Sequence, residues 1–122
     1  MKHTILLVVT MIILSCDHPA YHDFYILNKA DQSIVIEMVD SKFLKSSITV
    51  KPNSKELIYQ GETINEVDDN EITYFITKID IYKEGKKNCI DPLDYKHWKF
   101  EKYSKYQATS ILSIQTTDFD CK

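Results

Sequence analysis

Short stretches in which apolar and polar residues alternate restrict this chain to β structure. In residues 34–39 (IVIEMV), Ile34, Ile36 and Met38 recur at every second position. Successive side chains of an extended chain point to opposite faces, so these three side chains share one face. No long segment has the 3.6-residue period of a helix. We therefore interpret residues 34–39 as a strand with one buried face.

Six further segments have strand character, and turn residues separate several of them. Pro52 presets φ and Asn53 tolerates a bend, so this pair predicts a turn, and Glu84-Gly85 predicts another. Short strands spaced about 8–12 residues apart predict an all-β domain, an antiparallel β-sandwich of about seven strands with an Ig-like or similar Greek key topology. The predicted strands are residues 24–27, 34–39, 46–51, 57–59, 72–82, 98–100 and 106–115.

Helical structure is expected only as short turns. Asp91, Pro92 and Asp94 have the order of an N-cap, a first helical residue and an acidic third residue, which predicts one helical turn before Trp98. Residues 72–82 (ITYFITKIDIY) are instead interpreted as the longest strand. The residues expected on one face of that strand are Phe75, Thr77, Ile79 and Ile81.

The first residues have the pattern of an export signal. Lys2 and His3 form a basic head, and residues 5–14 (ILLVVTMIIL) form an apolar core. A bilayer-spanning helix needs about 20 apolar residues, whereas secretory signal peptides have cores of about 7–15 residues. We predict a signal peptide at residues 1–15, a polar tether at 16–23 and a single β-sandwich domain at 24–122.

Residues 13–16 (ILSC) resemble the bacterial lipobox, which has an aliphatic residue three places before an obligatory cysteine and a small residue directly before it. In lipoproteins with this motif, a diacylglycerol is attached to the cysteine, the chain is cut before it, and the new amine is usually acylated. Leu14 is slightly larger than usual for its place. The resemblance implies acyl chains such as palmitate on Cys16 and a stable anchor in the cell envelope, most commonly at the outer membrane.

A second resemblance runs through the rest of the chain. It is carried by the segments YILNKADQSIVIEM, ITVKPNSKEL and FITKIDIYKEGKK, by the segment around Trp98 and by the closing TTDF. These segments resemble small, uncharacterised lipoproteins of Bacteroidetes-type bacteria. The similar residues are mostly turn and core residues, so the resemblance implies a fold and implies no activity.

The charge balance argues against a nucleic-acid partner. The chain has 15 lysines, no arginine and 18 acidic residues, with a formal net charge of −3. Without arginine it lacks the bidentate fork that binds phosphate and guanine, and its lysines are spread along the chain. Gly61 and Gly85 are the two glycines, which excludes a glycine-rich phosphate-binding loop. We predict no nucleic-acid partner and no cofactor.

Two further cysteines, Cys89 and Cys121, remain once Cys16 is lipidated. Export places a protein where disulfides persist, and two remaining cysteines are an even number. We predict that Cys89 and Cys121 form a disulfide. It would close a loop of about 32 residues, for which chain entropy gives a stabilisation of about 3–4 kcal/mol.

Two clusters contain metal-binding residue types at poor spacing. His18 and His22 lie four residues apart, as helical zinc ligands do, but Pro19 disfavours a helix at His18. Residues 68–71 (DDNE) carry oxygen ligands. A calcium loop of the EF-hand type alternates its ligands and has glycine at its sixth position, which this run does not. We interpret the first cluster as solvated tether and the second as a solvated acidic loop, and predict no metal site.

The richest aromatic stretch lies between residues 95 and 106, where lysines separate the rings. Exposed rings there would stack on a glycan or anchor a protein partner. The alternative is that Trp98 and Phe100 belong to the core. The residues of the candidate binding patch are Tyr95, Trp98, Tyr103 and Tyr106.

The favoured hypothesis for function is a non-enzymatic, lipid-anchored envelope protein that binds an envelope protein or glycan or has a structural role there. One alternative is an inhibitor or immunity-type lipoprotein that blocks an incoming hydrolase or toxin. The other is a small periplasmic hydrolase that uses His97. A hydrolase requires a carboxylate within hydrogen-bond reach of His97, and no serine of the chain lies in a G-x-S-x-G motif.

Overall fold

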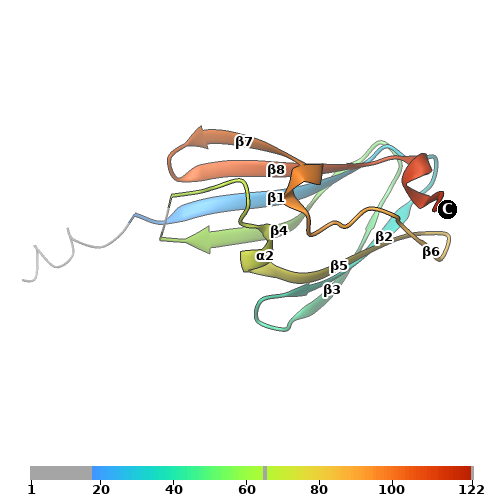
Figure 1. Ribbon diagram of the computed structural model, residues 1–122, viewed down its shortest axis with the longest axis horizontal. Coiled ribbons are helices and arrows are strands. Elements are labelled where there is room, and N and C mark those ends of the chain that lie inside the picture. The colour runs from blue at the N-terminus through green and yellow to red at the C-terminus, as the bar shows by residue number, and fades with distance from the viewer. Residues whose placement is uncertain (1–17, 65, 122) are drawn as a thin grey trace, which may run out of the picture.

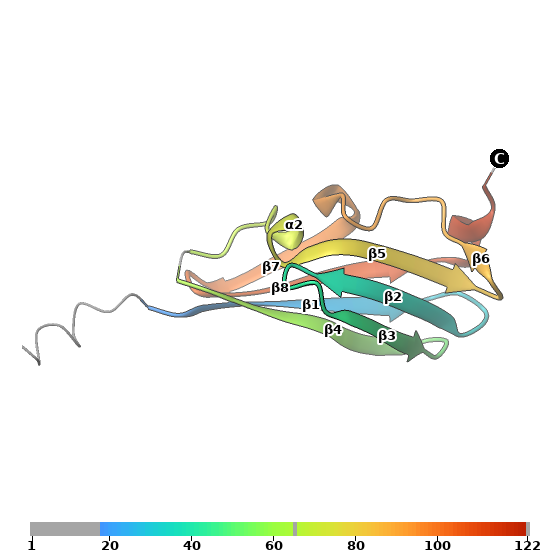
Figure 2. The same cartoon turned by 90° about the horizontal axis from the view of Figure 1, so that it is seen from below.

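The computed structural model describes residues 18–64 and 66–121 as two four-stranded sheets that form a sandwich (Figures 1 and 2). The predicted β-sandwich is therefore confirmed, with eight strands. The predicted signal peptide at residues 1–15 and the predicted lipidation site Cys16 lie outside the described residues.

The strand order is β4-β1-β8-β7 in one sheet and β3-β2-β5-β6 in the other. The strands are β1 (Ala20–Asn28), β2 (Ile34–Asp40), β3 (Lys45–Val50), β4 (Lys55–Thr63), β5 (Ile76–Lys83), β6 (Lys86–Lys87), β7 (Trp98–Ser104) and β8 (Gln107–Ile114). The helical segments are α2 (Ile72–Phe75) and the 3-10 turns η1 (Tyr95–His97) and η2 (Thr116–Phe119). Strand pairs are antiparallel except β1 with β8, which is parallel. A parallel pair needs a long connection, and the intervening strands supply it.

The two ends of the sandwich carry different segments. We call the end where β1 begins the proximal end, and the C-terminus lies at the opposite, distal end (Figure 1). Ala20 pairs with Thr63, and Tyr21 pairs with Gln107. The end of β4 and the β7–β8 turn therefore lie at the proximal end. The β2–β3 turn is on the same half of the molecule, set back along its long axis (Figure 1).

Strand β1 is longer than predicted, and this corrects the boundary of the tether. The tether was expected to extend through Asp23, whereas β1 begins at Ala20. The alternation that buries Phe24 continues backwards, so Ala20 and His22 are also buried. Residues 20–23 are part of the domain, and His22 lies in its interior.

The segment predicted as the longest strand begins with a helical turn instead. Residues 72–75 form α2, and β5 starts at Ile76. A β-bulge lies opposite Val39 and Asp40, and it leaves Thr77 exposed while Ile76 is buried. The prediction was therefore wrong for Thr77. It was right in placing Ile79 and Ile81 on one face, and both side chains are buried.

The packing of Phe75, the last residue of the helical turn, depends on a glycine. A Cβ atom at Gly61 of β4 would lie 2.6 Å from the ring of Phe75, which is closer than real Cβ contacts. The ring of Phe75 also packs against Tyr59 and Phe24, with centroids 5.8 and 6.0 Å apart. The absence of a side chain at Gly61 thus lets Phe75 cover β4 directly.

The predicted turns are present. Asn53 has φ of 60°, and Ser54 N donates to Lys51 O at 3.2 Å, which closes the turn between β3 and β4. Glu84 and Gly85 have φ of 52° and 76°, as the two central residues of a tight hairpin turn do.

The predicted helical turn before Trp98 is η1, but its cap differs from the prediction. Asp94, not Asp91, is the N-cap, because Asp94 Oδ1 accepts from Lys96 N at 3.0 Å. Asp91 instead accepts from Leu93 N at 3.0 Å within the preceding loop.

Candidate functional site

Trp98 belongs to the core and contributes no binding surface. Its side chain is 7% exposed, and its Nε1 donates to Pro92 O at 2.8 Å. The indole ring packs edge-on against Phe24, with ring centroids 5.7 Å apart. The aromatic patch with Trp98 at its centre is therefore not formed, because the hydrophobic side of β7 faces the interior.

Tyr95 lies apart from the other two tyrosines of the predicted patch, which flank the β7–β8 turn. Tyr95 lies in η1, just before β7, whereas Tyr103 is near the other end of that strand. Five residues of extended chain separate Trp98 from Tyr103, which is about 17 Å. Tyr106 is half-buried and its ring stacks on His18 at 4.1 Å. Tyr103 is the most exposed of the three and lies at the proximal end.

His97 does not meet the geometric condition set for a general base. Its Nε2 lies 3.9 Å from Asp94 Oδ2, beyond hydrogen-bond distance, and both side chains are more than a third exposed. Water therefore screens this pair.

A buried polar cluster is centred on His22, which the sequence interpretation assigned to the tether. His22 Nδ1 lies 3.0 Å from Glu71 Oε1, and His22 Nε2 lies 2.7 Å from Ser110 Oγ. The imidazole also stacks on Phe24, with centroids 4.2 Å apart. Both ring nitrogens are thus bonded, as a buried imidazole requires.

The partners of His22 determine where its proton lies. Burial lowers the pKa of His22, and the hydrogen bond and charge of Glu71 only partly oppose this effect. The neutral imidazole carries one N–H, and the Glu71 carboxylate can only accept. Nδ1–H therefore donates to Glu71, and the Ser110 hydroxyl donates to Nε2.

Ser110, His22 and Glu71 have the hydrogen bonds of a hydrolytic triad, but the serine is not accessible to a substrate. Ser110 and His22 are 1% and 0% exposed. A nucleophile must reach a substrate carbon held about 3 Å away. Because Ser110 lies between the two sheets, the arrangement acts in this structure as a buried polar network that joins β1, β8 and the loop before α2.

A signal for this cluster is present in the sequence. Ala20, His22, Phe24 and Ile26 follow the same two-residue period, so an extension of the predicted strand by two periods places His22 inside. The partners Glu71 and Ser110 lie 49 and 88 residues further on, and only the tertiary fold brings them together.

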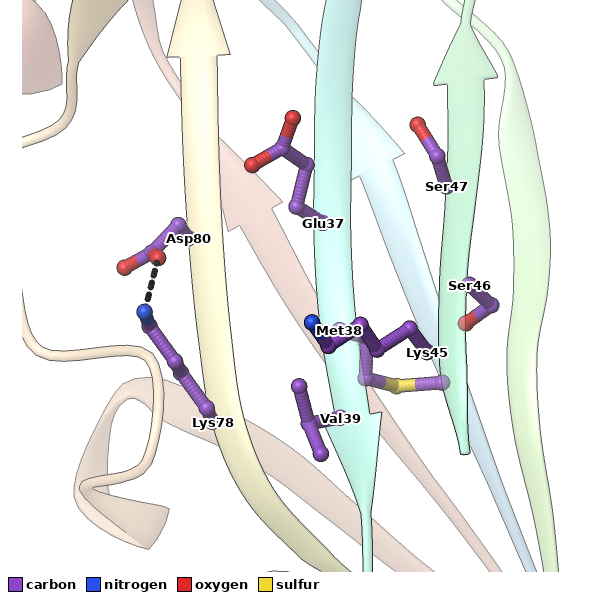
Figure 3. Close-up of a pocket in the computed structure, with 8 residues that line it drawn as sticks. All are labelled: Glu37, Met38, Val39, Lys45, Ser46, Ser47, Lys78 and Asp80. Atoms are coloured by element: carbon purple, nitrogen blue, oxygen red, sulfur yellow. Dashed lines mark ion pairs between the residues drawn. The ribbon is translucent and has the colours of Figure 1, made fainter. Parts of the chain in front are cut away.

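The outer face of the β3-β2-β5 sheet has a shallow hollow of about 460 Å³ (Figure 3). It is lined by charges of both signs, among them Glu37, Lys45, Lys78 and Asp80. Lys78 and Lys87 contact Asp80 at 3.4 and 3.0 Å. Burial alone would raise the pKa of Asp80, but the hydrogen bonds and charges of the two lysines outweigh it and lower the pKa. The Asp80 carboxylate is thus occupied by its ion pairs with Lys78 and Lys87.

The predicted disulfide pair is brought together at the distal end. Cys89 and Cys121 are joined by a disulfide with Cα atoms 5.4 Å apart. Cys89 N also donates to Asp118 O in η2 at 2.7 Å. The neighbouring Asn88 is buried, and its side-chain amide has no partner among the described protein atoms. These contacts hold η2 against the segment after β6.

None of the comparisons with known proteins gave a match, whether against protein-family models, curated proteins or solved structures. In residues 18–64 and 66–121, no helix is long and apolar enough to cross a membrane. The same residues contain no group of three or more His, Cys, Asp or Glu side chains arranged to hold a metal ion.

Proposed function

We propose that this protein is a bacterial envelope lipoprotein, anchored at the outer membrane through acyl chains on Cys16, with a non-enzymatic binding or structural role. The observation that carries the proposal is the ILSC sequence at residues 13–16, which follows a short apolar core and directly precedes the domain. The disulfide between Cys89 and Cys121 supports an exported location, because disulfides persist outside the cytoplasm.

The geometry of His22 and His97 does not match the hydrolase alternative. His97 has its nearest carboxylate at 3.9 Å. His22 has good partners, but Ser110 is buried with it. Neither histidine combines an accessible nucleophile with a hydrogen-bonded base, the arrangement that hydrolysis by a serine nucleophile uses.

Detergent phase partitioning tests the anchor. Wild-type protein expressed in a bacterial host should enter the detergent phase and incorporate a labelled palmitate analogue. Cys16→Ala should do neither, because it lacks the thiol that receives the lipid. Cys89→Ala is the matched control, since it also removes a thiol but should still partition as wild type does. Partitioning of Cys16→Ala into detergent would reject the lipid anchor.

Hydrolase assays test the non-enzymatic role. The purified protein is expected to leave ester, amide and glycoside substrates unchanged. Hydrolysis that is lost in His97→Ala or in Ser110→Ala, with the far-ultraviolet spectrum retained, would contradict the proposal and identify which histidine site is active.

A further inference from the structure

The most exposed large apolar side chains gather on the proximal half of the sandwich. Five of them are between 62% and 80% exposed among the described residues. They belong to the β2–β3 loop, the segment after β4, α2 and the last part of β7 (Figure 1). They are Phe43, Leu44, Ile64, Tyr74 and Tyr103. Apolar side chains gathered in this way mark an interaction surface.

Phe43 is exposed to solvent in a loop that is fixed by hydrogen bonds. Its φ is 64°, in the left-handed region that disfavours a bulky residue. Asp40 Oδ1 accepts from Lys42 N at 2.8 Å and from Leu44 N at 3.0 Å, and Phe43 N donates to Asp40 O at 3.0 Å. The loop therefore fixes an unfavourable backbone conformation and gains no packing of the Phe43 ring, a combination that points to a role outside the fold.

The β2–β3 loop shares one surface with β4 and α2. These three elements line a hollow of about 530 Å³, to which they contribute Lys42, Glu62 and Tyr74 respectively. Ser41 N donates to Phe75 O at 2.8 Å, which fixes the loop against α2. The loop that carries Phe43 and the helical turn that carries Tyr74 are thus held in a fixed relation to each other.

Contacts of His18 and Tyr21 fix the start of the described chain to the proximal end. The His18 ring stacks on Tyr106, and Tyr21 N donates to Tyr106 O at 2.8 Å. Under the proposed function, the lipidated Cys16 precedes His18 by two residues, which span at most about 7 Å. The proximal end must then lie against the headgroup layer of the membrane.

We propose that the surface formed by Phe43, Leu44, Ile64 and Tyr74 rests in the interface of the bilayer that holds the anchor, with Phe43 and Leu44 as its inserted tip. This inference depends on the proposed lipidation of Cys16. A lipid interface accommodates a small apolar tip without the large matched area that a stable protein interface requires.

The charges around the tip fit a lipid surface. Lys42 and Lys45 flank Phe43 and Leu44 directly, and neither ammonium group forms an ion pair with the residues that the structure describes. Their methylene stems can follow the apolar tip while the ammonium groups contact anionic phosphates.

Fluorescence quenching in vesicles tests the inference. Full-length lipidated protein is reconstituted in vesicles of phosphatidylethanolamine and phosphatidylglycerol that contain nitroxide-labelled lipid. Phe43→Cys or Tyr74→Cys carries an environment-sensitive dye, since Cys16 is acylated and Cys89 and Cys121 are bonded. Lys51→Cys, exposed at the distal β3–β4 turn, is the matched control.

The dye at position 43 should emit at shorter wavelength and be quenched several-fold more strongly than the dye at position 51, with position 74 between them. Equal quenching at positions 43 and 51, in protein retained on the vesicles, would overturn this inference and leave the anchor standing. Failure of the wild-type protein to stay on the vesicles would overturn the proposed function as well. A dye at position 43 that leaves water only when envelope proteins are added would overturn the lipid assignment in favour of a protein partner.

Discussion

His22 Nδ1 on β1 lies 3.0 Å from Glu71 Oε1, 49 residues further along the chain. The same Glu71 oxygen accepts from Asp68 N at 2.9 Å, and the Glu71 backbone oxygen accepts from Tyr74 N at 2.9 Å. One carboxylate therefore joins a fully buried imidazole to the loop that connects the two sheets. The same connection carries Tyr74, so these hydrogen bonds join the buried His22 to the proximal surface.

We expect the free energy of unfolding to fall as the pH drops below about 6.5, the pKa of an unperturbed histidine. Burial lowers the pKa of His22 in the folded state. Between the two pKa values the unfolded chain binds a proton that the folded chain does not, so acid favours unfolding over that window. Above about pH 6.5 both states are neutral at this residue and the effect is absent.

Denaturant unfolding at several pH values between about 8 and 5 measures this dependence. The slope of stability against pH should flatten in His22→Gln, whatever the absolute stability of that variant. His97→Gln, a substitution at an exposed histidine, is the matched control. A His22→Gln variant that retains the wild-type slope would show that another group titrates.

Gly61→Ala should destabilise the protein by about 1–3 kcal/mol, because the new Cβ would overlap the Phe75 ring. The clash is with ring atoms, so shortening that side chain should relieve it. In a double-mutant cycle, Phe75→Leu should cost less in the Gly61→Ala background than in the wild type. Additive effects of the two substitutions would contradict the proposed close approach.

The sequence predictions were accurate where contacts between residues close in the sequence determine the structure. The alternation of Ile34, Ile36 and Met38 correctly predicted β2, since one buried face is a property of the strand itself. The turn at Glu84-Gly85 was also predicted, because its backbone angles depend on those two residues. Local chemistry was sufficient in both cases.

Contacts between distant segments account for the errors. Residues 72–75 have strand-like composition, yet they form a helical turn whose Phe75 ring packs closely over Gly61 of the distant strand β4. His22 was interpreted as solvated because its partners, Glu71 and Ser110, lie far away in the sequence. No local sequence pattern predicts the parallel pairing of β1 with β8. The candidate surface at the proximal end was missed for the same reason, since it combines segments from three parts of the chain.

Removal of the disulfide should lower the free energy of unfolding by about 3–4 kcal/mol, mainly through the greater entropy of the unfolded chain. The variant is Cys89→Ala with Cys121→Ala, compared with wild type with and without reductant. Reductant should destabilise the wild type and leave the double variant unchanged. Alkylation of both thiols in unreduced, exported protein would contradict the pairing.

Phe43→Asn should make the protein more stable and weaken its contact with lipid. Asparagine accepts a left-handed φ more readily than phenylalanine, and the exposed ring has no packing to lose, so we expect a gain of up to about 1 kcal/mol. Leu44→Asn is the matched control, because Leu44 is similarly exposed and does not have a positive φ. Its stability should stay within about 0.5 kcal/mol of the wild type. In vesicles that contain nitroxide lipid, both substitutions should reduce quenching of a dye at position 74. Higher stability together with weaker lipid contact in Phe43→Asn would show that the chain retains a strained residue for its role at the membrane. Unchanged quenching would show that the strained residue has no such role.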